Sequence, residues 1–303
     1  MFLVRILITG ITGLLGYGLT KTLVEKGVEV SGIYKENKTV ADELSTLAKV
    51  YPVDITKQSE VKYVFNRVKP DVVIHAAAFA SVDGCELFRS LAWEINVNGT
   101  QQVVNVAKET DAKLIYISTD YVFDGETGGY TEEDKPNPLN YYGLTKLEGE
   151  KIVTNNLADY IVARVSLVYG EHPQHRGTIN RIIFDLKKGK KLYLVADQFL
   201  TPTYSTDIGN MLLELINREA TGIYHVAGST CLSRYDIGKM IARVFEFDDS
   251  LISRISMPGA DWTARRPRKS CLSVDKLIRF VGKAPRSLEE GLLDLKEKLR
   301  IKK

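Results

Sequence analysis

The stretch that decides the fold reads Ile-Thr-Gly-Ile-Thr-Gly-Leu-Leu-Gly and covers residues 8–16. An apolar segment typical of a buried strand, residues 3–8, leads into it, and a helical pattern follows at once. The three glycines are spaced one residue more loosely than the G-x-G-x-x-G pattern of dinucleotide-binding loops. We expect Gly10 to allow the tight turn, Gly13 to let the backbone approach a pyrophosphate, and Gly16 to let the helix pack on the sheet. The stretch therefore predicts a nucleotide-binding turn.

Short β-branched apolar runs alternate with helical patterns through the first half of the chain. The expected strands cover residues 3–8, 29–33, 48–53, 72–75, 113–118 and 160–164, and the helices between them include 15–25 and 94–109. This alternation is typical of βαβ units whose parallel sheet is buried on both faces. It predicts an α/β fold built on a Rossmann-type doubly wound parallel sheet.

The pattern becomes less regular after residue 168. Further helices are expected near 180–187, 235–245 and 288–299, with short strands near Leu192 and Tyr224. We therefore predict a dinucleotide-binding domain over residues 1–168 and a smaller carboxy-terminal α/β substrate lobe over 169–303. Part of 200–222 is expected to return to the first domain.

Composition places the 303-residue chain among globular proteins, with 44% hydrophobic and 26% charged residues. A balance of 41 basic and 38 acidic residues leaves a net charge of +3, which argues against nucleic acid as the main partner. No apolar run approaches the roughly 18 residues that a membrane helix needs, and the amino terminus lacks a secretory cleavage pattern. We expect a cytoplasmic protein with no membrane partner.

The cysteines and histidines do not suggest a metal centre. Cys85, Cys231 and Cys271 are odd in number and widely spaced, so neither a disulfide framework nor a zinc site is expected. His172 and His175 lie close together, but no acidic or cysteine cluster completes a set of metal ligands. The prediction is no metal, and a surface loop around the two histidines.

Cofactor contacts are expected along the edge of the sheet where the strands end. Asp54 closes the third strand, where an adenine would lie against apolar side chains beside a carboxylate; capping of a helix explains the same residue equally well. His75 is expected to be packed, whereas the small residues after it permit close approach of a cofactor. The expected cofactor-binding residues are Gly10, Thr12, Gly13, Leu14, Leu15, Gly16, Lys35, Asp54, Ile55, Ala76, Ala77, Ala78, Tyr142 and Lys146.

The end of the second strand bears on the choice of cofactor. NAD-specific folds usually place Asp or Glu there, about 20 residues past the glycines, to hold the adenine ribose hydroxyls. Tyr34 occupies that place, and Lys35 and Lys38 offer positive charge to a 2′-phosphate, although simple solvation also explains both lysines. We expect NADP(H) to be favoured and NAD(H) to be accepted.

Tyr142 and Lys146 are four residues apart at the start of an expected helix and therefore share one face. An ammonium beside a phenol lowers the pKa of the phenol, which can then exchange a proton near neutral pH. The pair alone is also typical of a solvated helix face. Ser118 and Thr119, however, follow the fifth strand at the sheet edge where ligands bind, so the combination predicts proton-transfer chemistry with either hydroxyl as a candidate.

These motifs together resemble the extended short-chain dehydrogenases/reductases. Four stretches narrow the resemblance to the dTDP-4-dehydrorhamnose reductase family: STDYVFDG at 118–125, PLNYYGLTK at 138–146, DQF at 197–199 with PT at 202–203, and ARRP at 264–267. The similarity runs from Gly10 to about Leu277. It implies a nucleotide-sugar substrate whose 4-keto group is reduced with NAD(P)H.

The resemblance also implies roles for single residues. Tyr142 would donate the proton, Lys146 would hold the nicotinamide ribose and tune Tyr142, and Thr119 would hydrogen-bond the reacting carbonyl. Asp120 and Arg266 are expected to bind substrate, with Arg266 gripping the diphosphate. Arg266 belongs to the basic run 265–269, which a solvated loop explains about as well. Asn96 matches a position that commonly supports a proton relay, and it completes the set of implied roles.

Two departures leave the exact sugar open. Leu167 stands where the family usually has an aromatic residue, and residues 177–178 are Gly-Thr where Asn-Phe is common. Two other functions are therefore kept: a non-catalytic nucleotide-binding subunit resembling the β-subunit of methionine adenosyltransferase, and a nucleotide-sugar epimerase. A homodimer is left open.

Overall fold

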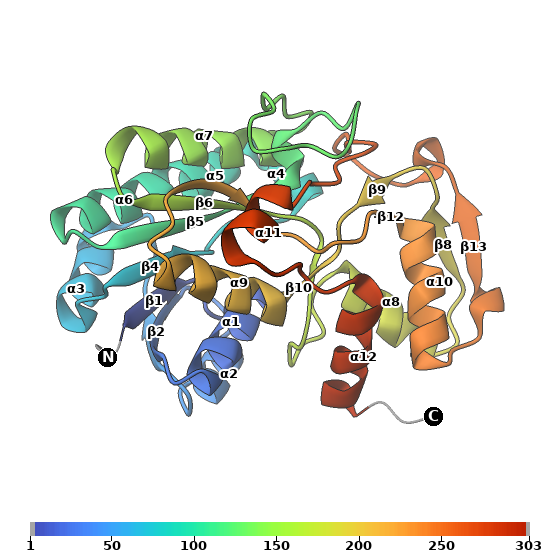
Figure 1. Cartoon of the computed structure of the whole chain (residues 1–303), viewed down its shortest axis with the longest axis horizontal. Helices are drawn as coiled ribbons and strands as arrows, with labels where there is room; N and C mark the ends of the chain where they lie inside the picture. The colour runs from blue at the N-terminus through green and yellow to red at the C-terminus, as the bar shows by residue number, and fades with distance from the viewer. Residues whose placement is uncertain (1–3, 301–303) are drawn as a thin grey trace.

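A seven-stranded parallel sheet forms the centre of the protein (Figure 1). The computed structural model describes residues 4–300, so the first residue of the expected strand 3–8 lies outside the described part. The strands run in the order β11-β6-β5-β4-β1-β2-β3. Their bounds are β1 Arg5–Thr9, β2 Glu29–Tyr34, β3 Lys49–Pro52, β4 Val72–His75, β5 Lys113–Thr119, β6 Tyr160–Val165 and β11 Gly222–His225.

Helices cover both faces of this sheet, because its strands are apolar on both sides. One face packs against α1 (Leu14–Glu25), α2 (Lys38–Leu44) and α9 (Ser205–Asn217). The other packs against α3 (Gln58–Val68), α6 (Gly99–Glu109) and α7 (Tyr141–Asn156). The predicted doubly wound α/β fold is confirmed.

The order of the strands fixes where a ligand can bind. β1 lies between β4 and β2. The chain continues from β1 to β2 and β3 on one side of β1, and then crosses to β4 on its other side, so the order of the strands reverses at β1. A crevice opens beyond the carboxyl ends of the strands at such a reversal. The glycine loop follows β1 at this point, and Ser118 and Thr119 close β5 nearby.

The smaller lobe has its own apolar core, to the right in Figure 1. Its helices α8 (Thr178–Lys187), α10 (Arg234–Phe245) and α12 (Leu288–Leu299) pack beside the parallel pair β8 (Leu192–Val195) and β13 (Ile252–Ile255). The remaining elements are β7 Val168–Tyr169, β9 Phe199–Leu200, β10 Thr203–Tyr204, β12 Leu232–Ser233, α4 Val82–Leu87, α5 Arg89–Trp93 and α11 Asp275–Val281. The expected smaller α/β lobe is confirmed.

Segments from the second half of the chain also join the first core. α9 packs on α1, and β11 extends the sheet beside β6. Leu277 of α11 belongs to the same apolar core. A division at residue 168 stays a prediction for the folding units. None of the helices within residues 4–300 is both long and apolar enough to cross a membrane.

Two features differ from expectation. The expected helix 94–109 starts as a π-helical turn, Glu94–Asn98, which turns the Asn96 side chain inward before α6 begins. Cys231 and Cys271 form a disulfide bond, whereas no disulfide was expected. The reason is the pairing of β9: Phe199 pairs with Ser233 in β12 and also bridges Lys269, so both cysteines come to one place.

Candidate functional site

The glycine loop has no room for side chains where the turn is tightest. Gly10 has φ 72°, in the left-handed region, and a Cβ there would lie 2.7 Å from the Cα of Ala77. A Cβ on Gly16 would lie 2.3 Å from the carbonyl oxygen of Gly10. The loop is therefore a cradle that fits a pyrophosphate at the start of α1, where the helix amides point outward.

A cavity of about 230 Å³ lies beside this loop. Most of the expected cofactor residues line it: Gly10, Thr12, Gly13, Lys35, Asp54, Ile55, Ala76, Ala77 and Ala78. Leu14, Leu15 and Gly16 do not line it and instead lie at the start of α1, and Tyr142 and Lys146 do not line it either. One residue of the smaller lobe, Arg176, lines it too, and sequence reasoning missed that residue.

Lys35 and Asp54 form an ion pair at the wall of this cavity, with 2.7 Å between Nζ and Oδ2. Burial raises the pKa of Asp54, but hydrogen bonds from Lys35 and Thr56 outweigh it, so the pKa lies below its usual value. Asp54 does not cap α3 directly, as the helix-capping alternative expected. Its carboxylate instead accepts hydrogen bonds from the amide and the hydroxyl of Thr56, which lies ahead of α3. The charge of Lys35 thus already has a partner.

Tyr142 and Lys146 lie one turn apart at the start of α7. Asn140 caps this helix by accepting a hydrogen bond from the amide of Gly143 at 2.8 Å. Lys146 is only 3% exposed, and its Nζ lies 4.0 Å from the centre of the Tyr116 ring. Burial lowers the pKa of Lys146 to about 7, against a smaller opposing effect of Glu150.

The pKa of Tyr142 does not follow the sequence-based expectation. Burial raises it well above the ordinary value, and a hydrogen bond with Thr119 only partly offsets this rise. The expected lowering by Lys146 is wrong for this structure, because the ammonium group lies over the ring of Tyr116. The phenol therefore keeps its proton at neutral pH.

The two hydroxyls at the end of β5 have different partners. Ser118 donates to Glu150, which lies one turn beyond Lys146 on α7. Glu150 in turn forms a buried ion pair with Arg164, with bonds of 3.0 and 2.8 Å. Thr119 is the hydroxyl that acts on Tyr142. Sequence reasoning missed Glu150, although its spacing of four from Lys146 would have placed it on the same helix face.

Asp120 makes contacts within the protein. Its side chain is 2% exposed and accepts hydrogen bonds from Ser166 at 3.0 Å and from Ser270. Thr119 donates to its other oxygen at 3.2 Å. Burial raises its pKa to about 6 despite these bonds. Asp120 thus joins β5 to two segments on the way to the smaller lobe, and its expected role in substrate binding stays a prediction.

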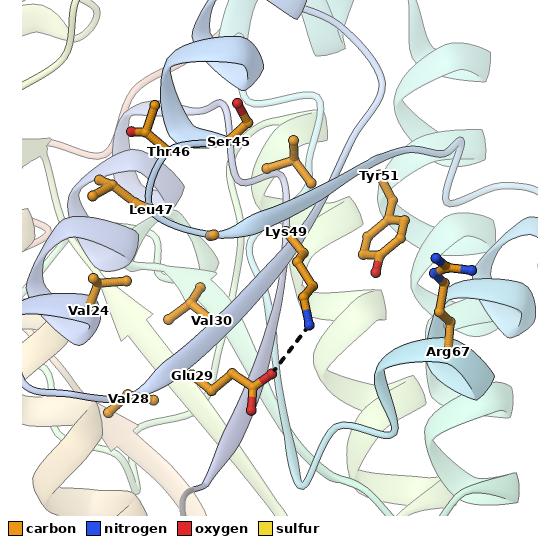
Figure 2. A pocket seen from close by; sticks show the side chains of 12 residues that line it. Val24, Val28, Glu29, Val30, Ser45, Thr46, Leu47, Lys49, Tyr51 and Arg67 are labelled. Carbon is orange, nitrogen blue, oxygen red and sulfur yellow. Dashed lines mark ion pairs between the residues drawn. The ribbon is translucent and has the colours of Figure 1, made fainter.

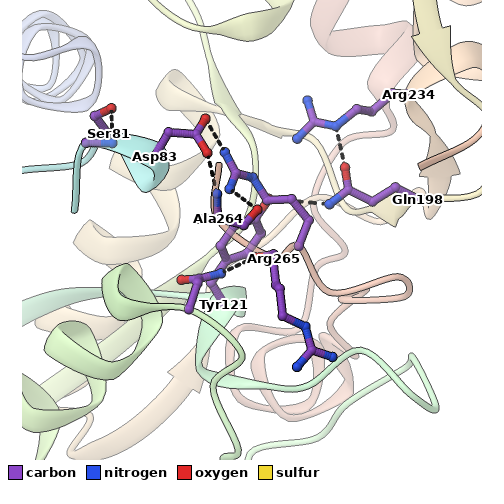
Figure 3. A network of polar contacts seen from close by, with 10 residues as sticks. Ser81, Asp83, Tyr121, Gln198, Arg234, Ala264 and Arg265 are labelled. Atoms are coloured by element: carbon purple, nitrogen blue, oxygen red, sulfur yellow. Dashed lines mark hydrogen bonds and ion pairs between the residues drawn. The ribbon is translucent and has the colours of Figure 1, made fainter. Parts of the chain in front are cut away.

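Arg266 belongs to a polar network that joins α4 to the loop at Ala264, and Figure 3 shows Asp83 and Ala264 of this network. Its guanidinium pairs with Asp83 of α4 at 2.8 Å and donates to the carbonyl of Ala264 at 2.9 Å. The side chain is 8% exposed, so the solvated-loop alternative is wrong for Arg266, whereas Arg265 points away from the network in Figure 3. Gln198, fully buried beside it, accepts from Arg234 and donates to the carbonyl of Pro267. Binding of a diphosphate by Arg266 stays a prediction.

Three further residues noted in the sequence lie in or near the site. His75 is packed, as expected: it hydrogen-bonds Thr9 and Thr100, and burial lowers its pKa to about 3. Asn96 bonds both backbone groups of Phe79 and donates to Thr145, which fixes α7 against the loop after β4. Leu167 has φ 36°, a conformation that favours glycine.

The expected surface loop around the histidines is only partly correct. His175 is exposed, and its ring stacks on that of Phe184 with 3.6 Å between the ring centres. His172 is 1% exposed, because its ring is packed over the glycine loop and its Nε2 lies 3.2 Å from the carbonyl oxygen of Thr12. Within residues 4–300, no three His, Cys, Asp or Glu side chains gather as metal ligands would.

A larger cavity of about 610 Å³ lies elsewhere (Figure 2). It is found at the amino ends of β2 and β3, where Lys49 and Glu29 point toward each other at 3.8 Å. None of the predicted site residues lines it. Since ligands of such sheets bind at the opposite edge, the smaller cavity beside the glycine loop is the candidate site.

Comparison with known proteins identifies relatives along the full length. Residues 4–301 match the family described as RmlD substrate binding domain. The chain is 34% identical over 95% of its length to a probable low-salt glycan biosynthesis reductase of Haloferax volcanii, of which it covers 96%. It is 33% identical over 96% of its length to dTDP-4-dehydrorhamnose reductase of Aggregatibacter actinomycetemcomitans, of which it covers 98%. It is also 33% identical over 90% of its length to methionine adenosyltransferase 2 subunit beta of Xenopus laevis, of which it covers 82%.

Solved structures agree with these matches. The dTDP-4-dehydrorhamnose reductase of Bacillus anthracis, in complex with NADP, has a TM-score of 0.83 and 31% identity, covering 97% of this chain and 99% of that one. The corresponding structure from Clostridium acetobutylicum has a TM-score of 0.85 and 32% identity, with 98% and 99% covered. The chain therefore belongs to the RmlD substrate binding domain family, a branch of the extended short-chain dehydrogenases/reductases.

Proposed function

We propose that this protein reduces the 4-keto group of a nucleotide-linked 6-deoxy sugar with NAD(P)H, converting dTDP-4-dehydrorhamnose to dTDP-L-rhamnose. The observation that carries the proposal is the grouping of Thr119, Tyr142 and Lys146 at the carboxyl edge of the sheet, the edge at which the glycine loop also lies. Family membership and the reductases among the relatives support it.

The cofactor would supply the hydride when it is bound at the glycine loop. The fit rests on the glycine loop itself. A Cβ at Gly13 would lie only 3.2 Å from the carbonyl oxygen of Gly10, so the loop has a glycine, with no side chain, where a pyrophosphate would lie. Ala76, Ala77 and Ala78 line the cavity with small side chains, which leave room for a flat group of the cofactor. Lys146 would hold the nicotinamide ribose.

Tyr142 acts as the proton donor. Because burial raises its pKa, the phenol is protonated at neutral pH, which is the form that a donor to a carbonyl oxygen needs. Thr119 lowers the same pKa through its hydrogen bond and thereby stabilises the phenolate that forms when the proton leaves. To hydrogen-bond the reacting oxygen, Thr119 would turn its single hydroxyl proton away from Asp120, to which it donates at 3.2 Å in the structure.

Lys146 supplies positive charge one helical turn from Tyr142. Burial opposes that charge, but Glu150 favours it, and Arg164 balances the charge of Glu150 in turn. The buried pair below Lys146 therefore offsets only part of the effect of burial, and the pKa of the lysine still falls to about 7.

The decisive experiment follows the absorbance of the reduced cofactor. Purified protein with NADPH and dTDP-4-dehydrorhamnose is expected to oxidise NADPH only when the sugar is present, and faster than with NADH. If the protein binds NADPH but leaves it unoxidised with this sugar, the proposed activity is wrong.

A second candidate function rests on the likeness to the methionine adenosyltransferase subunit. In this alternative the chain binds a nucleotide and regulates a separate catalytic subunit. Adding the protein to a methionine adenosyltransferase and measuring the kinetics of that enzyme tests the alternative. An unchanged rate together with sugar-dependent NADPH oxidation excludes it.

A further inference from the structure

A segment of the smaller lobe crosses the glycine loop. This segment, residues 171–177, joins β7 to α8, and we call it the strap. Both ends of the strap lie against α1. Glu171 forms an ion pair with Lys21 of α1 at 2.7 Å, and Gly177 lies so close to Leu14 that a Cβ at this glycine would be 2.7 Å from the leucine side chain. Between them, buried His172 hydrogen-bonds the carbonyl of Thr12. The strap is therefore fixed against the residues that form the phosphate cradle.

The strap delivers an arginine to the cofactor cavity. Arg176 lines this cavity together with Gly13, Lys35 and Asp54. Its side chain is exposed, and within residues 4–300 its guanidinium has no hydrogen bond or ion pair. Lys35 differs, because its ammonium is paired with Asp54 at 2.7 Å. Of these two cations, Arg176 is the one whose charge is available to an incoming anion.

We propose that Arg176 binds a phosphate group of the dinucleotide cofactor from the side of the smaller lobe. A guanidinium fork matches two phosphate oxygens, and the cradle at the start of α1 favours negative charge at the same place. The inference rests on the proposed function only in that the cavity takes NAD(P)H. The phosphate is either the diphosphate or the 2′-phosphate of the adenine ribose.

The test measures the Kd of NADPH and of NADH by titration of the full chain without any sugar. Arg176→Gln is expected to raise the Kd of NADPH about tenfold, as loss of one charged hydrogen-bonding group would. An equal rise for NADH assigns Arg176 to the diphosphate, and an unchanged Kd for NADH assigns it to the 2′-phosphate. Arg181→Gln, an exposed position on α8 that does not line the cavity, is the matched control and should leave both values unchanged.

The inference is overturned if Arg176→Gln binds both cofactors within twofold of the wild type. This outcome would leave the proposed reduction intact, because turnover with a sugar is measured separately. Conversely, a wild-type protein that binds NADPH but reduces no 4-keto sugar would contradict the proposed function and leave the assignment of Arg176 in place. Thermal unfolding of both variants checks that the fold is retained.

Discussion

Tyr142, Thr119 and Lys146 come from two elements whose relative position fixes their chemistry. Thr119 ends β5, while Tyr142 and Lys146 begin α7, and the cap at Asn140 sets where that helix starts. Burial pushes the pKa of the phenol up and that of the ammonium down, so both move toward their uncharged forms. The phenol is therefore protonated at neutral pH, whereas the charge of the lysine changes near pH 7.

Replacing Tyr142 by Phe tests the donor directly. We expect turnover to fall by about 10² to 10⁴, the usual contribution of a general acid, because only the hydroxyl is lost. The Kd of NADPH should stay within a few fold, since the ring remains. Single-turnover rates and cofactor titration of the same preparation separate the two effects. Turnover within threefold of the wild type would show that another group supplies the proton.

At the scale of elements, the loop that carries Arg266 is fixed from both sides. Asp83 of α4 pairs with Arg266, and Ser270 donates to Asp120 at the end of β5. Further along, the Cys231–Cys271 disulfide joins this loop to the segment that enters β12. The loop is thus attached to the sheet domain and to the smaller lobe.

Arg266→Ala is expected to raise the KM for the sugar nucleotide at least tenfold and to leave the Kd of NADPH unchanged. The physical reason is that a guanidinium matches diphosphate oxygens, and Arg266 lies away from the glycine loop. Asp83→Asn is the companion variant, since it frees Arg266 without removing it. Unchanged sugar kinetics in Arg266→Ala would limit this residue to holding the loop.

The disulfide gives a prediction for stability. Closing a loop across a sequence separation of 40 residues stabilises the fold by about 4 kcal/mol in the chain-entropy model, and measured values usually lie at about 2–4 kcal/mol. Cys231→Ser should therefore lower the free energy of unfolding by a comparable amount. The same decrease should follow reduction of the wild type, whereas reduction of Cys231→Ser should change nothing. A wild type insensitive to reductant would contradict this account.

At the scale of the whole molecule, the sequence predicts the sheet better than it predicts the contacts between distant segments. The strands of a buried parallel sheet are continuous apolar runs, so β4 appears with the expected ends. Asp83 and Arg266 lie 183 residues apart and meet only once both lobes are folded. The disulfide depends in the same way on which strands pair with β9, and Arg176 reaches the cavity only through the path of the strap.

The pH dependence of unfolding is also a property of the whole molecule. Burial lowers the pKa of His75 and of His225 to about 3, from 6.5 in the unfolded chain. Between these values the unfolded state binds more protons than the native state, so stability that is present above pH 6.5 is lost as the pH falls toward 3. Asp120 acts in the opposite direction, because its pKa is raised to about 6 and the native state keeps its proton below that pH.

His225→Gln isolates one of these contributions. A fully buried neutral histidine adds a slope of up to about 1.4 kcal/mol per pH unit between its two pKa values. Urea unfolding of the wild type from pH 7 to 4.5 should therefore lose stability more steeply than unfolding of the variant, by about that slope. The variant is expected to be less stable at pH 7, where the loss of packing dominates, and the two curves should converge as the pH falls. Parallel curves over this range would mean that His225 takes up its proton equally easily in the folded and unfolded states, contrary to its burial.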